Sequence, residues 1–229
     1  MTGTDRPMTE SGSRAPLRDA TAAEADRLPV LFVPGLRDSG PGVGQSRWLA
    51  RQRRFHRVIQ DDWNTPHLNR WAASVARAID HCTERPLVVA HGFGCLATLR
   101  AAHFFERGIA GALLVAPADP DEFGVRTQLP SRRLVYPTIL VAGSDDPSLK
   151  LTKAGLLATR WGSEFVVLTG AAHRNVESGQ GPWPEGHALL RRLAIAASMV
   201  KAFAGRAPHV RSVTGSPQSP SHDRRPASP

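Results

Sequence analysis

The stretch Pro86–Leu96, PLVVAHGFGCL, constrains the fold of this chain more than any other. Its apolar run Leu87–Ala90 is typical of a buried strand. A helix-like segment over residues 95–102 follows after a short turn of small residues. A strand that passes through a tight turn directly into a helix predicts an α/β architecture.

The same alternation of apolar runs and amphipathic segments extends along most of the chain. The expected strands are Val30–Val33, Val58–Gln60, Leu87–Ala90, Gly111–Ala116, Thr138–Ala142 and Glu164–Leu168. The expected helices are Gln45–Phe55, Asn69–Cys82, Gly94–Glu106, Lys150–Trp161 and Glu185–Ala204. Apolar strands separated by helices of about a dozen residues are typical of parallel crossovers. The pattern therefore predicts a doubly wound parallel α/β sheet with strand order 2-1-3-4-5-6 and helices on both faces.

Two polar segments flank this predicted domain, which spans residues 28–204. Residues 1–27 lack hydrophobic periodicity, and residues 205–229 are rich in Pro, Ser and Arg. Neither segment can bury enough apolar surface to offset the entropy of ordering, so we expect two disordered tails.

Charge and composition narrow the functional classes. The net charge is +9, but the arginines are scattered and not interleaved with aromatic residues, which argues against nucleic acid as a partner. No stretch approaches the ~20 apolar residues that span a membrane, and no apolar run follows a basic start at the N-terminus. Cys82 and Cys95 lie in apolar helical contexts, which indicates buried thiols in a reducing compartment. We therefore expect a cytoplasmic protein without membrane contact.

Chemistry-bearing residues follow the predicted strands at their carboxyl ends, where the functional loops of open α/β sheets gather. Gly92 follows the third strand, Asp146 the fifth and His173 the sixth. A nucleophile in such a strand–turn–helix would stand at position 92, where glycine offers no side chain. Asp146 could accept a hydrogen bond from one nitrogen of His173 and leave the other free as a general base. The backbone N–H groups of Leu36 and Phe93 could form an oxyanion hole.

Long motifs in this order resemble the retinoblastoma-binding-protein-9-like, or YdeN-like, branch of the α/β-hydrolases, which are small single-domain serine hydrolases. The matching segments are FVPGLRDSGPG, QSRW, DDWNTP, VVAHGFGCLA, GALLVAPAD, VAGSDDP, ATRWGSEFV and AAHRNVESGQGPWPEG. They extend from about residue 29 to residue 193. The resemblance implies an α/β-hydrolase fold, with the base at His173 and the acid at Asp146 rather than at the neighbouring Asp145.

Two departures from the family pattern bear on activity. The family has Ser where this chain has Gly92, and it usually has Gly-His-Trp-Gln where residues Gly42–Gln45 read GVGQ. Both departures remove side chains from the expected mouth of the active site. Three residues offer substitutes: His91 flanks the turn, Cys95 follows it by one helical turn, and Ser39 lies in the predicted oxyanion loop. We favour a structural role for His91 and Cys95, and we do not expect Ser39 to act as a nucleophile.

These observations leave two functional interpretations. No paired His/Cys spacing fits zinc, and the glycine loops lack a Gly-Lys-Ser/Thr phosphate signature, so we expect neither a metal nor another cofactor. The leading interpretation is a hydrolase-family pseudoenzyme. Its serine esterase or amidase chemistry is lost or severely weakened, and it binds a small-molecule carbonyl or carboxylate ligand. The alternative is a protein-interaction module on the same scaffold, with a protein partner.

Overall fold

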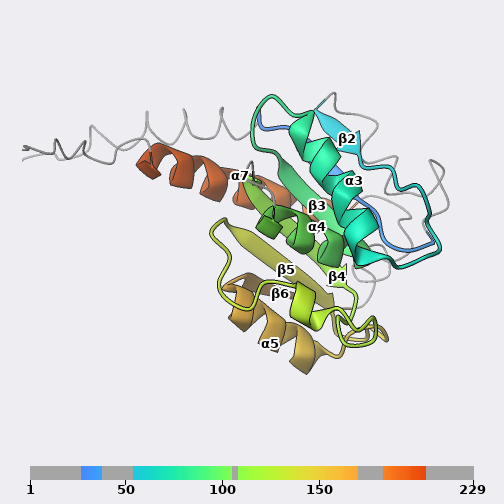
Figure 1. The fold of residues 1–229 in the computed structure, drawn as a ribbon. Coiled ribbons are helices and arrows are strands. Elements are labelled where there is room, and N and C mark those ends of the chain that lie inside the picture. Colours follow the sequence, from blue (N-terminus) through green and yellow to red (C-terminus); the bar gives the residue numbers. More distant parts are fainter. Residues whose placement is uncertain (1–26, 38–53, 105–107, 170–182, 205–229) are drawn as a thin grey trace, which may run out of the picture.

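The computed structural model describes residues 27–37, 54–104, 108–169 and 183–204. Its centre is a six-stranded sheet in the order β2-β1-β3-β4-β5-β6 (Figure 1). The strands are β1 (Val30–Val33), β2 (Phe55–Arg57), β3 (Leu87–Gly92), β4 (Gly111–Pro117), β5 (Thr138–Gly143) and β6 (Glu164–Leu168). Every neighbouring pair is parallel. The fold class and strand order predicted from the sequence are confirmed.

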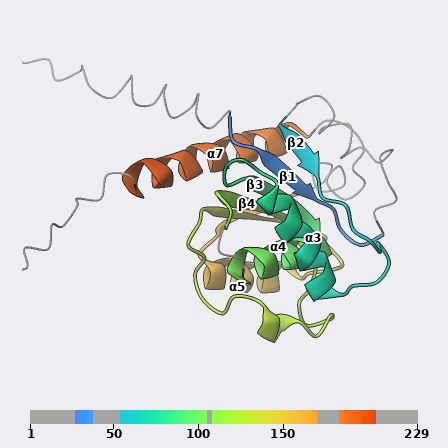
Figure 2. The same ribbon diagram turned by 45° about the horizontal axis from the view of Figure 1, so that its top comes forward.

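Helices cover both faces of the sheet (Figures 1 and 2). The helices are α3 (Leu68–Asp80), α4 (Phe93–Phe104), α5 (Leu151–Trp161) and α7 (Pro184–Ala204), and a short 3₁₀ turn η1 spans Arg126–Gln128. Helices α3, α4 and α5 contribute to one buried apolar cluster, whereas α7 packs into a second cluster on the opposite face. The sheet is therefore the middle layer of a three-layer molecule.

The central strands are apolar because both of their faces are covered. All residues of β4 and β5 are buried, as are the first four residues of β3. The outer strands differ, because β2 and β6 contain exposed and half-buried positions. This contrast is typical of a parallel sheet whose helices cover the centre more completely than the edges.

The second strand is the one strand that the sequence analysis misplaced. We expected it at Val58–Gln60, but β2 begins three residues earlier, at Phe55, where the first expected helix was to end. Val58 and Gln60 are buried and Ile59 is 64% exposed, so the alternation that suggested a strand is real. Val58 N–H donates to the Phe32 carbonyl, one residue before the end of β1. The pairing with β1 therefore ends where the predicted strand begins.

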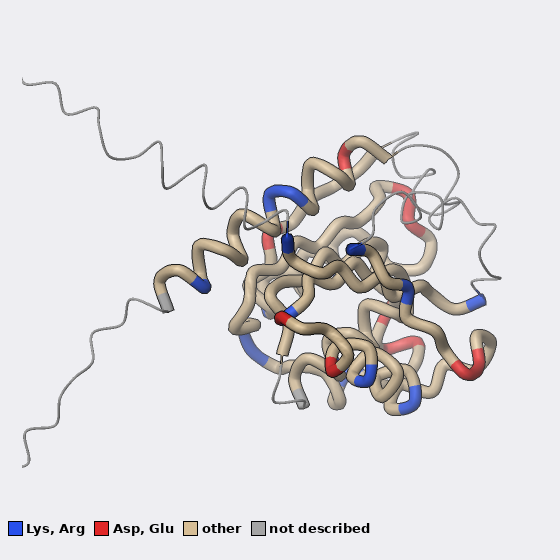
Figure 3. The backbone as a smooth tube through the Cα atoms, turned by 90° about the horizontal axis from the view of Figure 1, so that it is seen from above, with Lys and Arg blue, Asp and Glu red and all other residues tan. Residues whose placement is uncertain are grey.

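The remaining boundaries agree closely with those expected, and some predictions fall outside the described residues. Residues 45–53 of the first expected helix and the tails 1–26 and 205–229 are among the latter. Within the described ranges, no helix is both long and apolar enough to cross a membrane. Lysines and arginines are distributed over several elements instead of collecting along one of them (Figure 3).

Candidate active site

The β3–α4 turn lies at the carboxyl edge of the sheet. Strand β3 ends at Gly92, and α4 begins at the next residue, Phe93. Gly92 has a φ angle of +53°, a left-handed conformation that residues with a side chain rarely adopt. The register with β4 shifts at this point, and the Gly92 carbonyl accepts a hydrogen bond from Ala118 N–H at 3.1 Å. The chain therefore turns sharply from strand to helix, as the sequence predicts.

The loop after β1 closes one side of this turn. A Cβ atom built on Gly94 would lie 2.3 Å from the Pro34 oxygen, so α4 can start directly against this loop only because residue 94 is glycine. A Cβ atom built on Gly35 would lie 3.7 Å from the Gly92 Cα atom. The close approach brings Leu36, the residue after Gly35, to the same edge as Phe93. The Phe93 N–H belongs to the first turn of α4, where backbone donors have no partner within the helix.

Aromatic rings pack against the first residue of α4, directly after the turn. Phe93 is 1% exposed, and its ring packs edge-on against Trp71 of α3 at a centroid distance of 5.3 Å. Trp63 meets Trp71 in the same way at 5.8 Å, and Phe123 lies 5.0 Å from Phe93 on the other side. The Trp63 carbonyl also accepts the Arg37 N–H at 2.8 Å. These contacts fix the positions of the β1 loop and the first turn of α4.

Asp146 lies in the loop after β5. Its Oδ1 accepts the Ser148 N–H at 2.8 Å, while its Oδ2 is buried and has no hydrogen-bond partner among the described residues. Asp145, by contrast, is exposed. His173 lies outside the described residues, but β6, the strand before it, pairs with β5 up to Gly143↔Leu168. The chain thus enters the loops that carry Asp146 and His173 from neighbouring strand ends.

The structure describes two of the three substitute residues considered from the sequence, the thiol of Cys95 and the possible substitute base His91. Cys95 is fully buried, and its thiol donates to the carbonyls of Ala90 and Val115 at 3.2 and 3.5 Å. Burial raises the pKa of this thiol far above its usual value, so it does not form a thiolate near neutral pH. The Nδ1 atom of His91 lies 3.0 Å from the position of a Gly35 Cβ, so the ring packs against the β1 loop. Ser39 lies outside the described residues.

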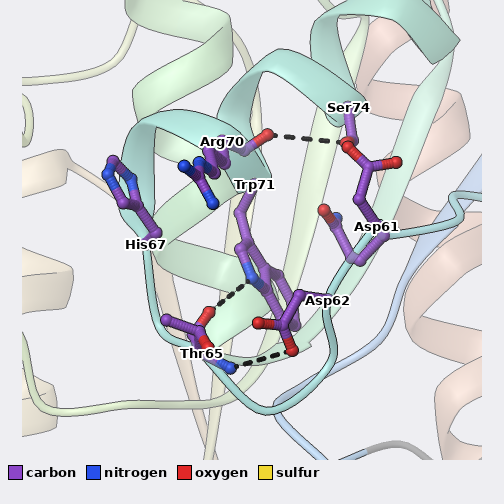
Figure 4. Close-up of a pocket in the computed structure, with 8 residues that line it drawn as sticks. Asp61, Asp62, Thr65, His67, Arg70, Trp71 and Ser74 are labelled. Atoms are coloured by element: carbon purple, nitrogen blue, oxygen red, sulfur yellow. Dashed lines mark hydrogen bonds between the residues drawn. The ribbon is translucent and has the colours of Figure 1, made fainter.

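Sequence reasoning missed a polar pocket at the carboxyl end of β2 (Figure 4). The pocket has a volume of about 160 Å³ and is lined by Gln60, Asp61, Asp62, Thr65, His67, Arg70, Trp71 and Ser74. Figure 4 shows His67 and Arg70 on one side of Trp71 and Asp61 on the other. The Trp71 indole donates to the Thr65 carbonyl at 3.1 Å. The signal was available, because two carboxylates follow the second strand at the edge where functional loops gather.

Two groups in this pocket are electrostatically distinctive. The Asp62 carboxylate accepts the backbone N–H groups of Asn64 and Thr65, and hydrogen bonds from Thr65 and Asn64 lower its pKa. Gln60 is 4% exposed, and its Nε2 has no hydrogen-bond partner among the described residues. The pocket therefore combines a fixed carboxylate with an amide donor that lacks an acceptor.

A second feature that the sequence did not reveal is a charged network after β4. Lys153 at the start of α5 donates to Asp119 at 2.5 Å and to Asp121 at 2.6 Å. Asp121 also pairs with Arg126 through both carboxylate oxygens. These bonds to Arg126 and Lys153 hold the pKa of Asp121 well below its usual value. The network ties α5 to the loop that begins at Ala118, the donor to the Gly92 carbonyl.

A parallel sheet with a sharp strand–turn–helix at its centre and functional loops at its carboxyl edge defines an α/β-hydrolase fold. The sequence pattern of the serine hydrolase family matches residues 30–192, and the chain belongs to this family. The described residues contain no group of His, Cys, Asp and Glu side chains that could hold a metal ion.

Solved structures agree with this assignment. A YdeN-like hydrolase from Pectobacterium atrosepticum is 35% identical, with a TM-score of 0.68 over 80% of this chain and 98% of its own. The ydeN gene product of B. subtilis is 16% identical, with a TM-score of 0.57 over 72% of this chain and 98% of its own. A monoacylglycerol lipase from Paleococcus ferrophilus is 14% identical, with a TM-score of 0.55, and the match covers 74% of this chain and 96% of the lipase. The latter two show a shared fold alone. No curated protein matches this chain.

Proposed function

We propose that this member of the serine hydrolase family has lost serine-type acyl transfer, or retains it only weakly, and that it binds a carbonyl or carboxylate ligand at the β3–α4 turn. The observation that carries the proposal is Gly92, which lies at the end of β3 with a φ angle of +53°. In the α/β-hydrolase arrangement, this is where the nucleophile stands. Glycine supplies the backbone conformation but not the nucleophilic oxygen.

The surrounding groups support ligand binding at this turn. The N–H groups of Leu36 and Phe93 are the proposed oxyanion donors, and they act without side chains, so Gly92 does not remove them. The buried Oδ2 of Asp146 lacks a partner among the described residues, which suits a carboxylate that orients His173. The polar pocket beside α3 lies at the same edge, and Trp71 belongs both to its wall and to the packing behind Phe93.

The remaining groups can still assist a slow reaction with water. His173 would take a proton from water, and the resulting hydroxide would attack the carbonyl carbon of an ester or amide. The two backbone donors would stabilise the oxyanion, and the histidine would return its proton to the leaving group. Serine proteases that lack a triad member keep about 10³–10⁴-fold acceleration over water from the oxyanion hole and binding alone. We expect residual activity no larger than this.

Two assays on the wild-type chain test the proposal. Incubation with a fluorophosphonate probe, read by mass spectrometry, should label no residue, and turnover of p-nitrophenyl acetate should be weak. That turnover should fall about tenfold or more in His173→Ala and Asp146→Asn, because general-base assistance contributes at least that much. Asp145→Asn is the matched control and should behave like wild type. Stoichiometric labelling of the wild-type chain would contradict the proposal.

A second candidate function is supported by the outermost strand β6 and the adjacent helix α5. Strand β6 exposes Phe165 and Val167 by 37% and 41%, and Leu156 of α5 is 71% exposed beside them. An apolar surface of this kind favours a protein-interaction module, since such patches often mark contact surfaces. Sedimentation velocity tests whether this surface binds a second copy of the chain. Self-association that Leu156→Glu abolishes would support the interaction module, and a monomer at all concentrations would argue against self-association through this surface.

A further inference from the structure

A cavity that is partly open to solvent lies at the amino edge of the sheet. The cavity has a volume of about 580 Å³ and lies between the starts of the central strands and the C-terminal half of α7. Leu28 precedes β1, Ala110 precedes β4 and Pro137 precedes β5, while Ala197 and Val200 belong to α7. The cavity is therefore at the end of the sheet opposite Gly92. Helix α7 extends beyond the sheet (Figure 2). We refer to this space as the amino-edge cavity.

The wall of the amino-edge cavity is mostly apolar. Residues from five segments of the chain contribute to it, and Leu28, Ile109 and Ala197 are each at most 5% exposed. Its volume is within the range of about 300–1,000 Å³ that is usual for ligand sites. Such sites combine an apolar wall with a small number of polar groups. The size and lining suit the chain of an apolar molecule.

Two hydroxyl groups in this wall lack acceptors. Ser198 is 2% exposed, and its Oγ has no hydrogen-bond partner among the described residues. The Oη of Tyr136 is likewise buried and has no described partner, and burial raises the pKa of this phenol, so it stays protonated. Buried polar groups in folded proteins nearly always have a partner. The two hydroxyls are therefore donors for which the described protein supplies no acceptor.

The mouth of the amino-edge cavity carries an uncompensated positive charge. Lys201 of α7 donates to Glu84 at 3.1 Å, so these two charges offset one another. Arg85 also lines the cavity, and no carboxylate pairs with it in the described part of the chain. An arginine guanidinium suits a carboxylate in particular, because its donors match the two oxygens.

We propose that the amino-edge cavity binds an amphipathic monocarboxylate of the fatty-acid type. Its hydrocarbon chain occupies the space between the sheet and α7, and its carboxylate faces Arg85. The two hydroxyl donors of this cavity have no acceptor among the described residues, and a carboxylate supplies acceptor oxygens only. The site is separate from the β3–α4 turn and does not depend on the function proposed there.

Decanoate is a suitable probe, and methyl NMR of the 229-residue chain locates its binding. Titration should shift the methyl signals of Leu28, Ile109 and Val200, and leave those of Leu36 near the β3–α4 turn unchanged. 1-Decanol and decyltrimethylammonium carry a hydrocarbon chain of similar length but no carboxylate, and they should bind at least tenfold more weakly. Equal binding of all three would overturn the proposal, because it would indicate a nonspecific apolar surface.

Variants of the protein separate the contributions that the hydrocarbon chain and the carboxylate of decanoate make to binding. Ala197→Phe fills the cavity and should abolish decanoate binding. Arg85→Gln should weaken it about threefold to tenfold, the range of a partly exposed ion pair. Arg160→Gln removes an exposed arginine of α5 outside the cavity and is the matched control. Should Ala197→Phe fail to fold, Val200→Glu places a negative charge on a half-exposed residue of the wall and should also reduce binding at least tenfold.

Other results would also overturn the proposal. Decanoate could fail to bind, could bind Ala197→Phe or Val200→Glu as tightly as wild type, or could shift methyl signals only outside the cavity. Failure to bind by a chain that dimerises with the same methyl groups at the contact would identify the amino edge as an interface between two copies of the chain.

Discussion

Gly92 and Gly94 lie two residues apart in the β3–α4 turn, yet a methyl group would meet very different surroundings at each. At Gly94 a Cβ atom would lie 2.3 Å from the Pro34 oxygen and 2.6 Å from the Val33 oxygen. At Gly92, among the described residues, it would meet only the Gly35 Cα atom, at 3.6 Å, which is an ordinary van der Waals contact. Packing within the described part of the chain therefore requires glycine at position 94 but not at position 92.

The two glycines of the turn therefore serve different structural requirements. Close packing between the β1 loop and α4 needs the glycine at 94, and that packing is intact. Position 92 has room for a side chain, and what disfavours one there is the φ angle of +53°. A serine would have to accept that backbone strain, whereas glycine avoids it. Among the described residues, the turn thus leaves space at position 92 for a side chain that glycine does not supply.

Of the variants at this turn, Gly94→Ala should lower the free energy of unfolding most. Its methyl group cannot fit without moving α4 away from the β1 loop, and overpacking of this kind costs about 3 kcal/mol. Gly155→Ala in α5 is the matched control, because its Cβ would lie 3.6 Å from the Phe165 ring. We expect that variant to gain about 0.5–1 kcal/mol from helix propensity. Urea denaturation measures both, and equal stabilities would contradict the packing argument.

Gly92→Ala tests the position at which a Cβ atom meets no clash among the described residues. Alanine in a left-handed conformation costs about 1–2 kcal/mol, and a less flexible unfolded chain returns about 0.4–1 kcal/mol of this. We therefore expect a net loss of about 1 kcal/mol in the free energy of unfolding. A loss as large as that of Gly94→Ala would mean that position 92 has no room for a side chain.

The charged network behind the turn should contribute a smaller, pH-dependent effect. Hydrogen bonds from Arg126 and Lys153 hold the pKa of Asp121 below its unfolded value of about 3.9. The stabilisation is therefore present above that unfolded pKa and is lost as the pH falls through the folded pKa. Wild type should have a higher urea midpoint than Asp121→Asn at pH 7, and the difference should shrink below about pH 4. A difference that stays constant down to pH 2.5 would contradict this assignment.

Cys95→Ala should have the smallest effect on activity. The thiol is buried beneath the turn and bonds to the Ala90 carbonyl, so it cannot reach a substrate. We expect residual turnover of p-nitrophenyl acetate to be unchanged in this variant. Alkylation by iodoacetamide should be slow at Cys95 in the native chain. A loss of turnover with unchanged folding would instead identify Cys95 as the substitute nucleophile.

The sequence was sufficient for the fold because its central strands are continuous apolar runs. The predicted boundaries of β1 and β6 agree with the structure at every residue. Strand β2 was misplaced because only one of its sides pairs with another strand, and its residues are half-buried or exposed. At such an edge, the alternation of Val58, Ile59 and Gln60 reflects burial, because the pairing with β1 does not continue past the hydrogen bond from Val58 to Phe32.

The features of the site that could be predicted are those set by the order of strands, turns and helices along the chain. The left-handed conformation of Gly92 follows from a strand that runs directly into a helix. Contacts between segments far apart in the chain could not be predicted, because no local pattern links Lys153 to Asp119 or Lys201 to Glu84. The pairing of Asp146 with His173 stays a prediction, since His173 lies outside the described residues.

Fluorophosphonate labelling of Gly92→Ser, with Gly92→Ala and wild type beside it, tests most directly whether the turn is a hydrolase site that lacks only its nucleophile. Serine and alanine add the same Cβ atom and should melt at similar temperatures, both below wild type. We expect the probe to label Gly92→Ser at residue 92, even if slowly because Val43 and Gly44 also depart from the family pattern. Wild type and Gly92→Ala should remain unlabelled. A folded Gly92→Ser chain that also stays unlabelled would contradict a retained hydrolase site and favour the interaction module.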